Sequence, residues 1–151
     1  MANPFESPEV AKLYTQYRPT YPATIYEKVF EFLDEGSDRK LRQLAIDVGC
    51  GSGQNSKVLT NSFENVLAVD ASEAQVEEAR TACSGLSNIT LRVGSAEDLD
   101  ELAEEGSVDL VTVATALHFF EVKPFFEACQ RVLRKGGVLA AYSYVSISLD
   151  N

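Results

Sequence analysis

The stretch AIDVGCGSGQN at residues 45–55 joins an apolar run to a carboxylate and then places glycine at positions 49, 51 and 53. Glycine has no Cβ, so it adopts positive φ angles and lets another group approach the main chain closely. A tight turn is the plainer interpretation, but a turn rarely needs three alternating glycines directly after a buried strand. We therefore expect a ligand to lie against the main chain of residues 49–53.

The apolar pattern on either side of this stretch alternates between strands and helices. Short apolar runs predict strands at residues 44–48, 66–69, 89–93, 108–114 and 138–144. Helical patterns and helix-start signals predict helices at residues 22–36, 54–62, 72–83, 95–106 and 124–135. This order predicts an α/β fold with a doubly wound, mostly parallel sheet.

Two of these helices show an apolar stripe that should face the core. In the first helix the stripe consists of Ile25, Val29, Phe32 and Leu33. In the last helix it consists of Phe125, Phe126, Cys129, Val132 and Leu133, and the glycines at 136 and 137 should turn the chain into the last strand. A further short helix is expected at residues 8–17, before Pro19.

The glycine loop should line the ligand crevice, because doubly wound sheets bind ligands beyond the carboxyl ends of their strands, where the strand order reverses. The dinucleotide fingerprint G-x-G-x-x-G/A does not fit, since its third position falls on Gln54 or Ser56. The phosphate-binding loop G-x-x-x-x-G-K-[ST] is absent. The failed fingerprint argues against a nucleotide-dependent oxidoreductase and leaves an aspartate followed by G-x-G-x-G.

Composition narrows the class of partner. The 151 residues suffice for one domain with its own core, and the formal net charge is −10. An acidic chain is a poor ligand for nucleic acid, whose phosphates are neutralised by Lys and Arg, and for anionic membranes. No apolar run approaches the ~20 residues of a membrane span. We expect a small-molecule or protein partner, no nucleic acid and no membrane.

The cysteines and the N-terminus bear on location. Cys50, Cys83 and Cys129 lie far apart in the chain, without the paired spacing of a metal or redox motif. The first ten residues lack the basic and apolar regions of a signal peptide. These features predict reduced thiols and a cytoplasmic location.

Several stretches beside the glycine loop are similar to class I S-adenosylmethionine-dependent methyltransferases. DVGCGSG resembles their glycine motif, and AVDAS, VGSAEDL, VDLVTVATALHFF and RVLRKGGVLA follow in that family's order over about residues 40–145. The leader AKLYTQYRPTYP and the stretch ALHFF resemble the trans-aconitate methyltransferase-like branch of the type 11 methyltransferase group. The resemblance implies a Rossmann-like methyltransferase fold with S-adenosyl-L-methionine as cofactor.

The resemblance also implies how the chain is divided. Residues 1–36 would form an N-terminal Tyr/Pro-rich cap segment with its helix, and residues 37–151 the S-adenosylmethionine-binding domain. The family's sheet usually continues for two strands beyond the fifth, so this domain is expected to be C-terminally short and to lack those last two strands. A fifth strand without its neighbour exposes an edge that can pair with another chain. A homodimer through that edge is therefore one expectation.

The implied function is transfer of a methyl group from the cofactor to a small molecule, with a carboxylic acid as one candidate acceptor. The alternative is a catalytically impaired cofactor-binding or regulatory protein, because substrate-capping residues would be missing from a short domain. In the resembled family Asp47 would face the cofactor's ammonium group, and Asp70 would hold the ribose. The other positions implied to contact the cofactor are Gly49, Gly51, Gly53, Ala71, Ser95, Ala96, Glu97 and Thr115.

Three residues are candidates for catalysis or acceptor binding, and no metal site is predicted. His118, the single histidine, follows the fourth predicted strand and could act as a base or orient the acceptor. The alternative is an imidazole packed between Leu117 and Phe119. Tyr17 and Arg18 lie in the leader, where Arg18 could pair with a carboxylate of the cofactor or acceptor. The alternative is a tyrosine-rich strap packed on the core.

Overall fold

A parallel sheet of five strands forms the centre of the molecule in the computed structural model, which describes residues 9, 20–36 and 42–144. The order across the sheet is β3-β2-β1-β4-β5, and every neighbouring pair is parallel. The strands are β1 (Leu44–Val48), β2 (Asn65–Asp70), β3 (Ile89–Val93), β4 (Val108–Ala114) and β5 (Leu133–Tyr142). The predicted doubly wound α/β fold is confirmed, and its strand order reverses between β1 and β4.

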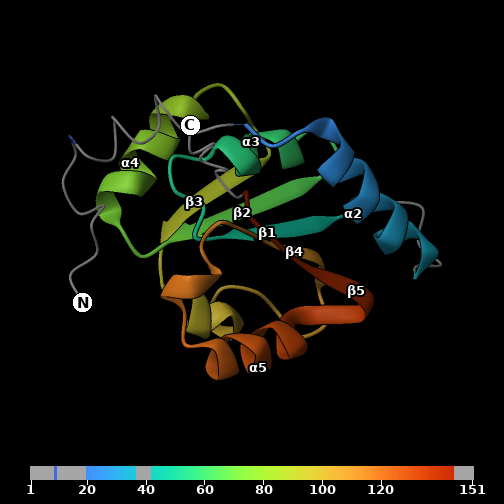
Figure 1. The fold of residues 1–151 in the computed structure, drawn as a ribbon. Helices are drawn as coiled ribbons and strands as arrows, with labels where there is room; N and C mark the ends of the chain where they lie inside the picture. Colours follow the sequence, from blue (N-terminus) through green and yellow to red (C-terminus); the bar gives the residue numbers. More distant parts are fainter. Residues whose placement is uncertain (1–8, 10–19, 37–41, 145–151) are drawn as a thin grey trace, which may run out of the picture.

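Helices cover both faces of the sheet. Figure 1 shows α2, α3 and α4 on one face, and α5 with the short η1 on the other. The bounds are α2 (Ala23–Glu35), α3 (Gln54–Leu59), α4 (Glu73–Ala82) and α5 (Val122–Val132), with 3-10 helices η1 (Ala96–Glu101) and η2 (Leu117–Phe119). None of the helices in the described ranges is both long and apolar enough to cross a membrane.

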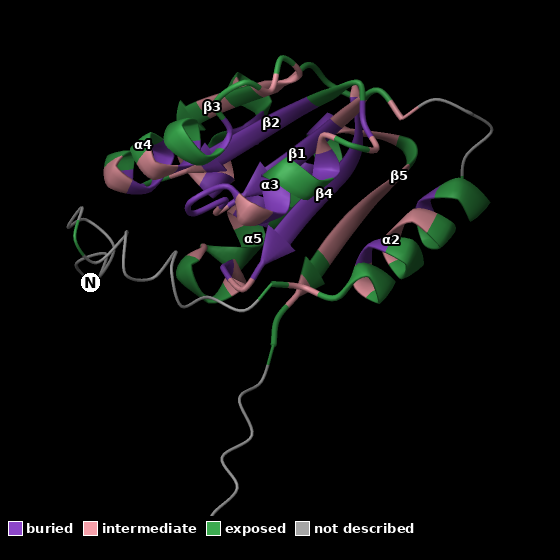
Figure 2. Cartoon of the chain, turned by 90° about the horizontal axis from the view of Figure 1, so that it is seen from above, coloured by how far each residue is buried: buried purple, intermediate pink, exposed green. Residues whose placement is uncertain are grey.

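The strands at the centre are buried on both faces because each face has its own helical layer. Figure 2 shows this burial concentrated in β1, β2 and β4. Successive side chains of a strand point to opposite faces, so Ile46 and Val111 join the cluster under α5, whereas Ala45 and Leu110 join the cluster under α2. The near-continuous apolar strands of the sequence follow from this double cover.

The buried face of α2 differs from the predicted stripe. Phe32 is 64% exposed, whereas Leu33 is buried as expected. Tyr26, which is not part of the predicted apolar stripe, is buried, and Val29 and Phe30 pack beside it. The spacing 26, 29, 30 and 33 forms a helical face of its own, and the sheet selects this face rather than the one through Phe32.

The C-terminal boundary between helix and strand also differs from the prediction. The helix ends at Val132 rather than 135, and β5 begins at Leu133 rather than 138. The pairing passes from Val108–Leu133 to Leu110–Val138, so the predicted glycine turn is a bulge within β5. Phe126, expected on the buried face of α5, is 45% exposed.

In the described part of the chain β5 lies at one edge of the sheet, beside β4 alone. Pairing of this edge with a second copy of the chain stays a prediction. So does the division of the chain at residue 36.

Candidate functional site

The predicted site residues of the described chain meet at one edge of the sheet, because parallel strands all end there. The glycine loop follows β1, Asp70 is the last residue of β2, and Ala71 follows it. Residues 95–97 follow β3, whereas Thr115 and His118 follow β4. Tyr17 and Arg18 lie outside the described residues, as does the helix expected at 8–17, so their roles stay predictions.

The glycine loop folds back over the end of β2. The amides of Gly49 and Cys50 both donate to the Val69 carbonyl, at 2.8 and 3.0 Å. The φ angles of Gly49, Gly51 and Gly53 are 66°, 55° and 82°, in the left-handed region that favours glycine. This backbone would be strained with any other residue at the three positions.

Packing within the chain imposes a second requirement on the first of these glycines. A Cβ on Gly49 would lie 2.5 Å from the Ala116 Cβ and 3.1 Å from the Phe120 Cζ, both on the segment after β4. The alternation of glycine therefore has a structural cause as well as the ligand-binding cause that we inferred from the sequence.

The Asp70 carboxylate holds the loop directly. One oxygen accepts the Gly51 amide at 2.8 Å, and the other accepts the Ser72 amide at 2.9 Å. Asp70 is half-buried at the edge of the sheet, whereas Ala71 beside it is exposed. The hydrogen bond from Gly51 thus joins the bare main chain of the loop to the carboxylate at the end of β2.

Asp47 has a different environment. Its side chain is 0% exposed and accepts hydrogen bonds from the Asn55 amide at 2.8 Å, the Ser56 hydroxyl at 2.5 Å and the Thr112 hydroxyl at 2.9 Å. A buried carboxylate must be hydrogen-bonded to stay charged, and these donors come from α3 and β4. They fix the start of α3 against the sheet. Contact of Asp47 with a cofactor stays a prediction.

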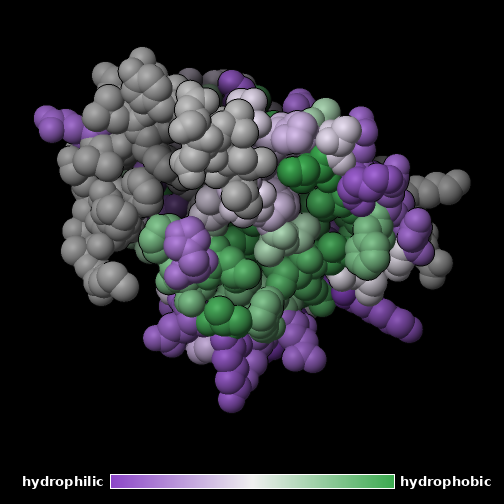
Figure 3. All heavy atoms as spheres, viewed as in Figure 1, coloured by the Kyte–Doolittle hydropathy of each residue, from purple (hydrophilic) through white to green (hydrophobic). Residues whose placement is uncertain are grey.

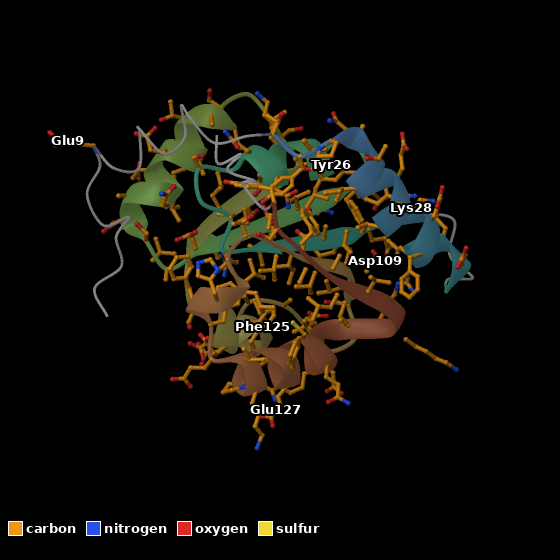
Figure 4. The ribbon with its side chains drawn as sticks, viewed as in Figure 1. Glu9, Tyr26, Lys28, Asp109, Phe125 and Glu127 are labelled. Carbon is orange, nitrogen blue, oxygen red and sulfur yellow. The ribbon has the colours of Figure 1, made fainter. Side chains whose placement is uncertain are left out.

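Asn55 extends this network to both ends of the described chain. Its Oδ1 accepts the Tyr26 hydroxyl at 2.8 Å and the Tyr142 hydroxyl at 2.7 Å. Tyr26, labelled in Figure 4, reaches inward from α2, and Tyr142 lies at the end of β5. Burial, with a smaller contribution from the charge of Asp47, raises the pKa of Tyr142 far above its usual value, so its hydroxyl stays protonated. Sequence reasoning missed this network, and the only local signal was two polar residues in the first turn of a short helix.

Residues 95–97 lie beside the end of β3. Ala96 is buried in the core, and the Ser95 hydroxyl donates to the Glu97 carboxylate. The Glu121 amide donates to the other Glu97 oxygen at 2.8 Å. Burial disfavours the charged form of Glu97, but these hydrogen bonds outweigh it and lower its pKa. Glu97 therefore joins the segment after β3 to the start of α5.

A cavity of about 480 Å³ opens beyond the ends of β4 and β5, and its lining includes Thr115, His118 and Tyr142. Thr115 has a φ of 58°, uncommon for a residue other than glycine, and its amide donates to the Tyr142 carbonyl at 2.8 Å. Its hydroxyl forms a hydrogen bond with the Tyr21 hydroxyl. His118 is exposed, and its ring lies 4.0 Å from that of Phe119. The sequence left open an imidazole packed between Leu117 and Phe119. The His118 ring does contact that of Phe119, but the residue is exposed to solvent and is therefore not buried between its neighbours.

The part of the chain that the structure describes contains no group of three or more His, Cys, Asp or Glu residues placed to hold a metal ion.

The chain is similar in sequence and in fold to known proteins. The family described as "Methyltransferase domain" matches residues 46–141. A Dictyostelium discoideum protein named as a methyltransferase is 37% identical over 142 residues, covering 94% of this chain and 50% of the relative. A ubiquinone biosynthesis O-methyltransferase of Sinorhizobium fredii is 33% identical over 129 residues, covering 82% of this chain and 51% of the relative.

A solved structure described as a methyltransferase also resembles this chain. A protein of Anaeromyxobacter dehalogenans, described as a type II methyltransferase, superposes with a TM-score of 0.72 at 36% identity. That match covers 89% of this chain and 52% of the other. The chain thus spans about half the length of the relatives it matches.

Proposed function

This chain belongs to the methyltransferase domain family, and we propose that it transfers the methyl group of S-adenosyl-L-methionine to a small-molecule acceptor. The single observation that carries the proposal is the hydrogen bond between Gly51 of the bare loop and Asp70 of β2. It joins the two features that the cofactor would need within one crevice at the carboxyl edge. The finer placement in the trans-aconitate methyltransferase-like branch rests on the leader and stays a prediction.

The residues at this edge fit S-adenosyl-L-methionine. The cofactor has no phosphate, and residues 49–54 contain no basic side chain. The Ser52 hydroxyl of the loop is buried, at 1% exposure, and has no hydrogen-bond partner among the described residues. The Asp70 carboxylate has the chemistry to accept ribose hydroxyls, as acidic residues at this strand end do in dinucleotide folds.

The role of the protein in this reaction would be to position the reactants. When bound, the cofactor supplies a methyl group activated by a positively charged sulfur. The loop after β1 and Asp70 would fix the cofactor, and the segment after β4 would hold the acceptor. Proximity and orientation alone can lower a barrier by ~7–11 kcal/mol when reactants are well aligned. Among the described residues that line the cavity, His118 is the group suited to taking a proton from the acceptor near neutral pH.

The alternative of a regulatory protein without catalysis has less support, because the relatives reported above are named as methyltransferases. None of these names supports a carboxylic acid as the acceptor.

Isothermal titration calorimetry with S-adenosylhomocysteine and with NAD tests the proposal. We expect S-adenosylhomocysteine to bind and NAD not to bind. Asp70→Asn should weaken S-adenosylhomocysteine at least tenfold, because a hydrogen bond to a charged group contributes about 1.5–3 kcal/mol. The matched control is Glu127→Gln, since Glu127 projects from α5 away from the sheet (Figure 4). Binding of NAD in place of S-adenosylhomocysteine would contradict the proposal.

A further inference from the structure

The lining of the cavity beyond β4 and β5 is mainly apolar. It includes Val113, Ala116, Leu117, Val122 and Ala141, and its volume of about 480 Å³ suits a small organic molecule. None of the lining residues in the described chain is Asp, Glu, Lys or Arg. Burying a charged group without a partner is costly, so this lining discriminates against charged acceptors.

Apolar side chains are also exposed in the lining and near it along the chain. Val122, which lines the cavity, is 47% exposed, whereas Phe119, which follows the lining residue His118, and Phe126 are 57% and 45% exposed. Val122 and Phe126 are one helical turn apart at the start of α5, and Phe119 lies in η2. Figure 3 shows hydrophobic side chains gathered on this face, over η2 and α5. Exposed apolar patches next to a cavity commonly mark ligand-binding surfaces.

The nearby charges also disfavour an anion. Glu121 precedes α5 and is exposed, and Glu97 accepts its amide with a pKa lowered by hydrogen bonding despite burial. The chain as a whole carries a net charge of −10. His118 alone among the described lining residues can become a cation, and as an exposed single side chain it would have to offset these carboxylates.

The hydroxyl groups of the lining are all engaged within the protein. The Tyr142 hydroxyl donates to Asn55, the Thr115 hydroxyl pairs with Tyr21, and the Ser143 hydroxyl donates to the Tyr144 carbonyl at 3.3 Å. The exposed His118 imidazole at the cavity can receive a proton from a ligand.

We propose that this cavity binds the methyl acceptor and that the acceptor is an uncharged, apolar molecule with a phenolic hydroxyl. The inference rests on the proposed function and names its substrate class. In the reaction the phenolic oxygen forms a bond to the methyl carbon, and the carbon–sulfur bond breaks with its electron pair passing to sulfur. The hydroxyl proton passes to His118 and then to water, and S-adenosylhomocysteine and the methyl ether are the products.

A matched set of three ligands tests the class of acceptor. Titration calorimetry of the full chain, saturated with S-adenosylhomocysteine, would compare 4-butylphenol, 4-butylbenzoate and 4-butylbenzylamine. They share a ring and an alkyl chain but are neutral, negative and positive at neutral pH. We expect the phenol to bind at least tenfold more tightly than either charged ligand. Equal or tighter binding of the benzoate or the amine would overturn the inference.

Substitutions of Val122, which lines the cavity, test where the acceptor binds. Val122→Lys should weaken the phenol at least fivefold, because a charge would stand in the apolar lining, and should strengthen the benzoate. Val122→Glu should weaken both, and an acidic residue is well tolerated in the first turn of a helix. The matched control Phe32→Glu alters an apolar side chain that is 64% exposed on α2 and should leave every affinity within twofold. An unchanged phenol affinity in both Val122 variants would overturn the assignment of the cavity.

The experiments distinguish failure of the proposed function from failure of the proposed acceptor class. If S-adenosylhomocysteine binds but the phenol does not, the acceptor class is wrong and the proposed function stands. If S-adenosylhomocysteine does not bind, the proposed function fails, and the acceptor assignment fails with it. Circular dichroism and thermal unfolding of each variant would show that it is folded before its affinities are compared.

Discussion

Single carboxylates at the edge of the sheet differ because their hydrogen-bond donors differ. Asp47 is enclosed by side-chain donors from α3 and β4, whereas Asp70 is held by two backbone amides. Glu97 accepts one hydroxyl and one amide and has a lowered pKa. Residue type therefore does not decide the role of a carboxylate at this edge, and the geometry of its donors does.

Glu97 leads to a prediction about pH. Because its pKa in the folded protein is below the ordinary value of 4.5, its charged form stabilises the fold. That contribution is fully present above pH 4.5 and is lost as the pH falls through the lower, folded-state pKa. We expect Glu97→Gln to lower the free energy of unfolding at neutral pH and to match the original protein more closely in acid, as measured by urea denaturation across this range.

The control is Glu101→Gln, which removes an exposed charge from the end of the same 3-10 helix. It should change stability little at either pH. A Glu97→Gln penalty that is the same at neutral and acidic pH would contradict the prediction.

At the scale of elements, the glycine loop lies between the end of β2 and the segment after β4. It can pack there because its three glycines have left-handed φ angles and because Gly49 has no Cβ where Ala116 and Phe120 approach. The same segment after β4 carries Thr115 and His118. Packing of the loop therefore also fixes one wall of the cavity beyond β4 and β5.

Gly49→Ala separates packing from backbone strain. We expect it to lower the free energy of unfolding by about 2–5 kcal/mol, the sum of left-handed strain and overpacking. Gly106 has nearly the same φ, 64° against 66°, but a Cβ there would meet nothing within 4 Å. Gly106→Ala should therefore cost only about 1–2 kcal/mol. Equal losses in urea denaturation would show that contact with Ala116 does not matter.

At the scale of the whole molecule, the two edges of the sheet serve different purposes. The candidate site residues lie at the carboxyl edge, whereas Asp109, labelled in Figure 4, lies near the start of β4. Asp109 is 0% exposed and accepts the Gln43 and Leu44 amides at 2.7 and 2.9 Å. It also pairs with Arg134 of β5 at 2.5 Å. This buried pair joins three strands at the edge opposite the site.

We therefore expect Asp109→Asn to reduce stability without altering the site. Removing the charge that faces a buried arginine typically costs about 3–5 kcal/mol. The control Asp100→Asn breaks a pair whose side chains are 42% and 48% exposed, and it should cost about 0–1 kcal/mol. Thermal unfolding with and without S-adenosylhomocysteine measures both properties. A smaller ligand-induced rise in Tm for Asp109→Asn would show that the two edges are coupled.

The elements that the sequence predicted well are those whose signal is local. Apolar runs located all five strands, and the stop at Gly36 located the end of α2. The start of β5 was wrong by five residues because a bulge opposite β4 absorbs the glycines that looked like a turn. The exposure of Phe32 was missed because two overlapping helical faces were available and only the sheet chooses between them.

The sequence by itself determined the fold and brought the candidate site residues to one edge of the sheet, where ligand binding stays a prediction. Strand periodicity and alternating glycines are local patterns, and parallel topology then brings the strand ends together. Only the tertiary structure decided that Gly49 faces Ala116, that Asn55 joins α2 to β5, and that an apolar cavity adjoins His118. Such contacts join residues far apart in the chain, and therefore no local pattern in a single sequence records them.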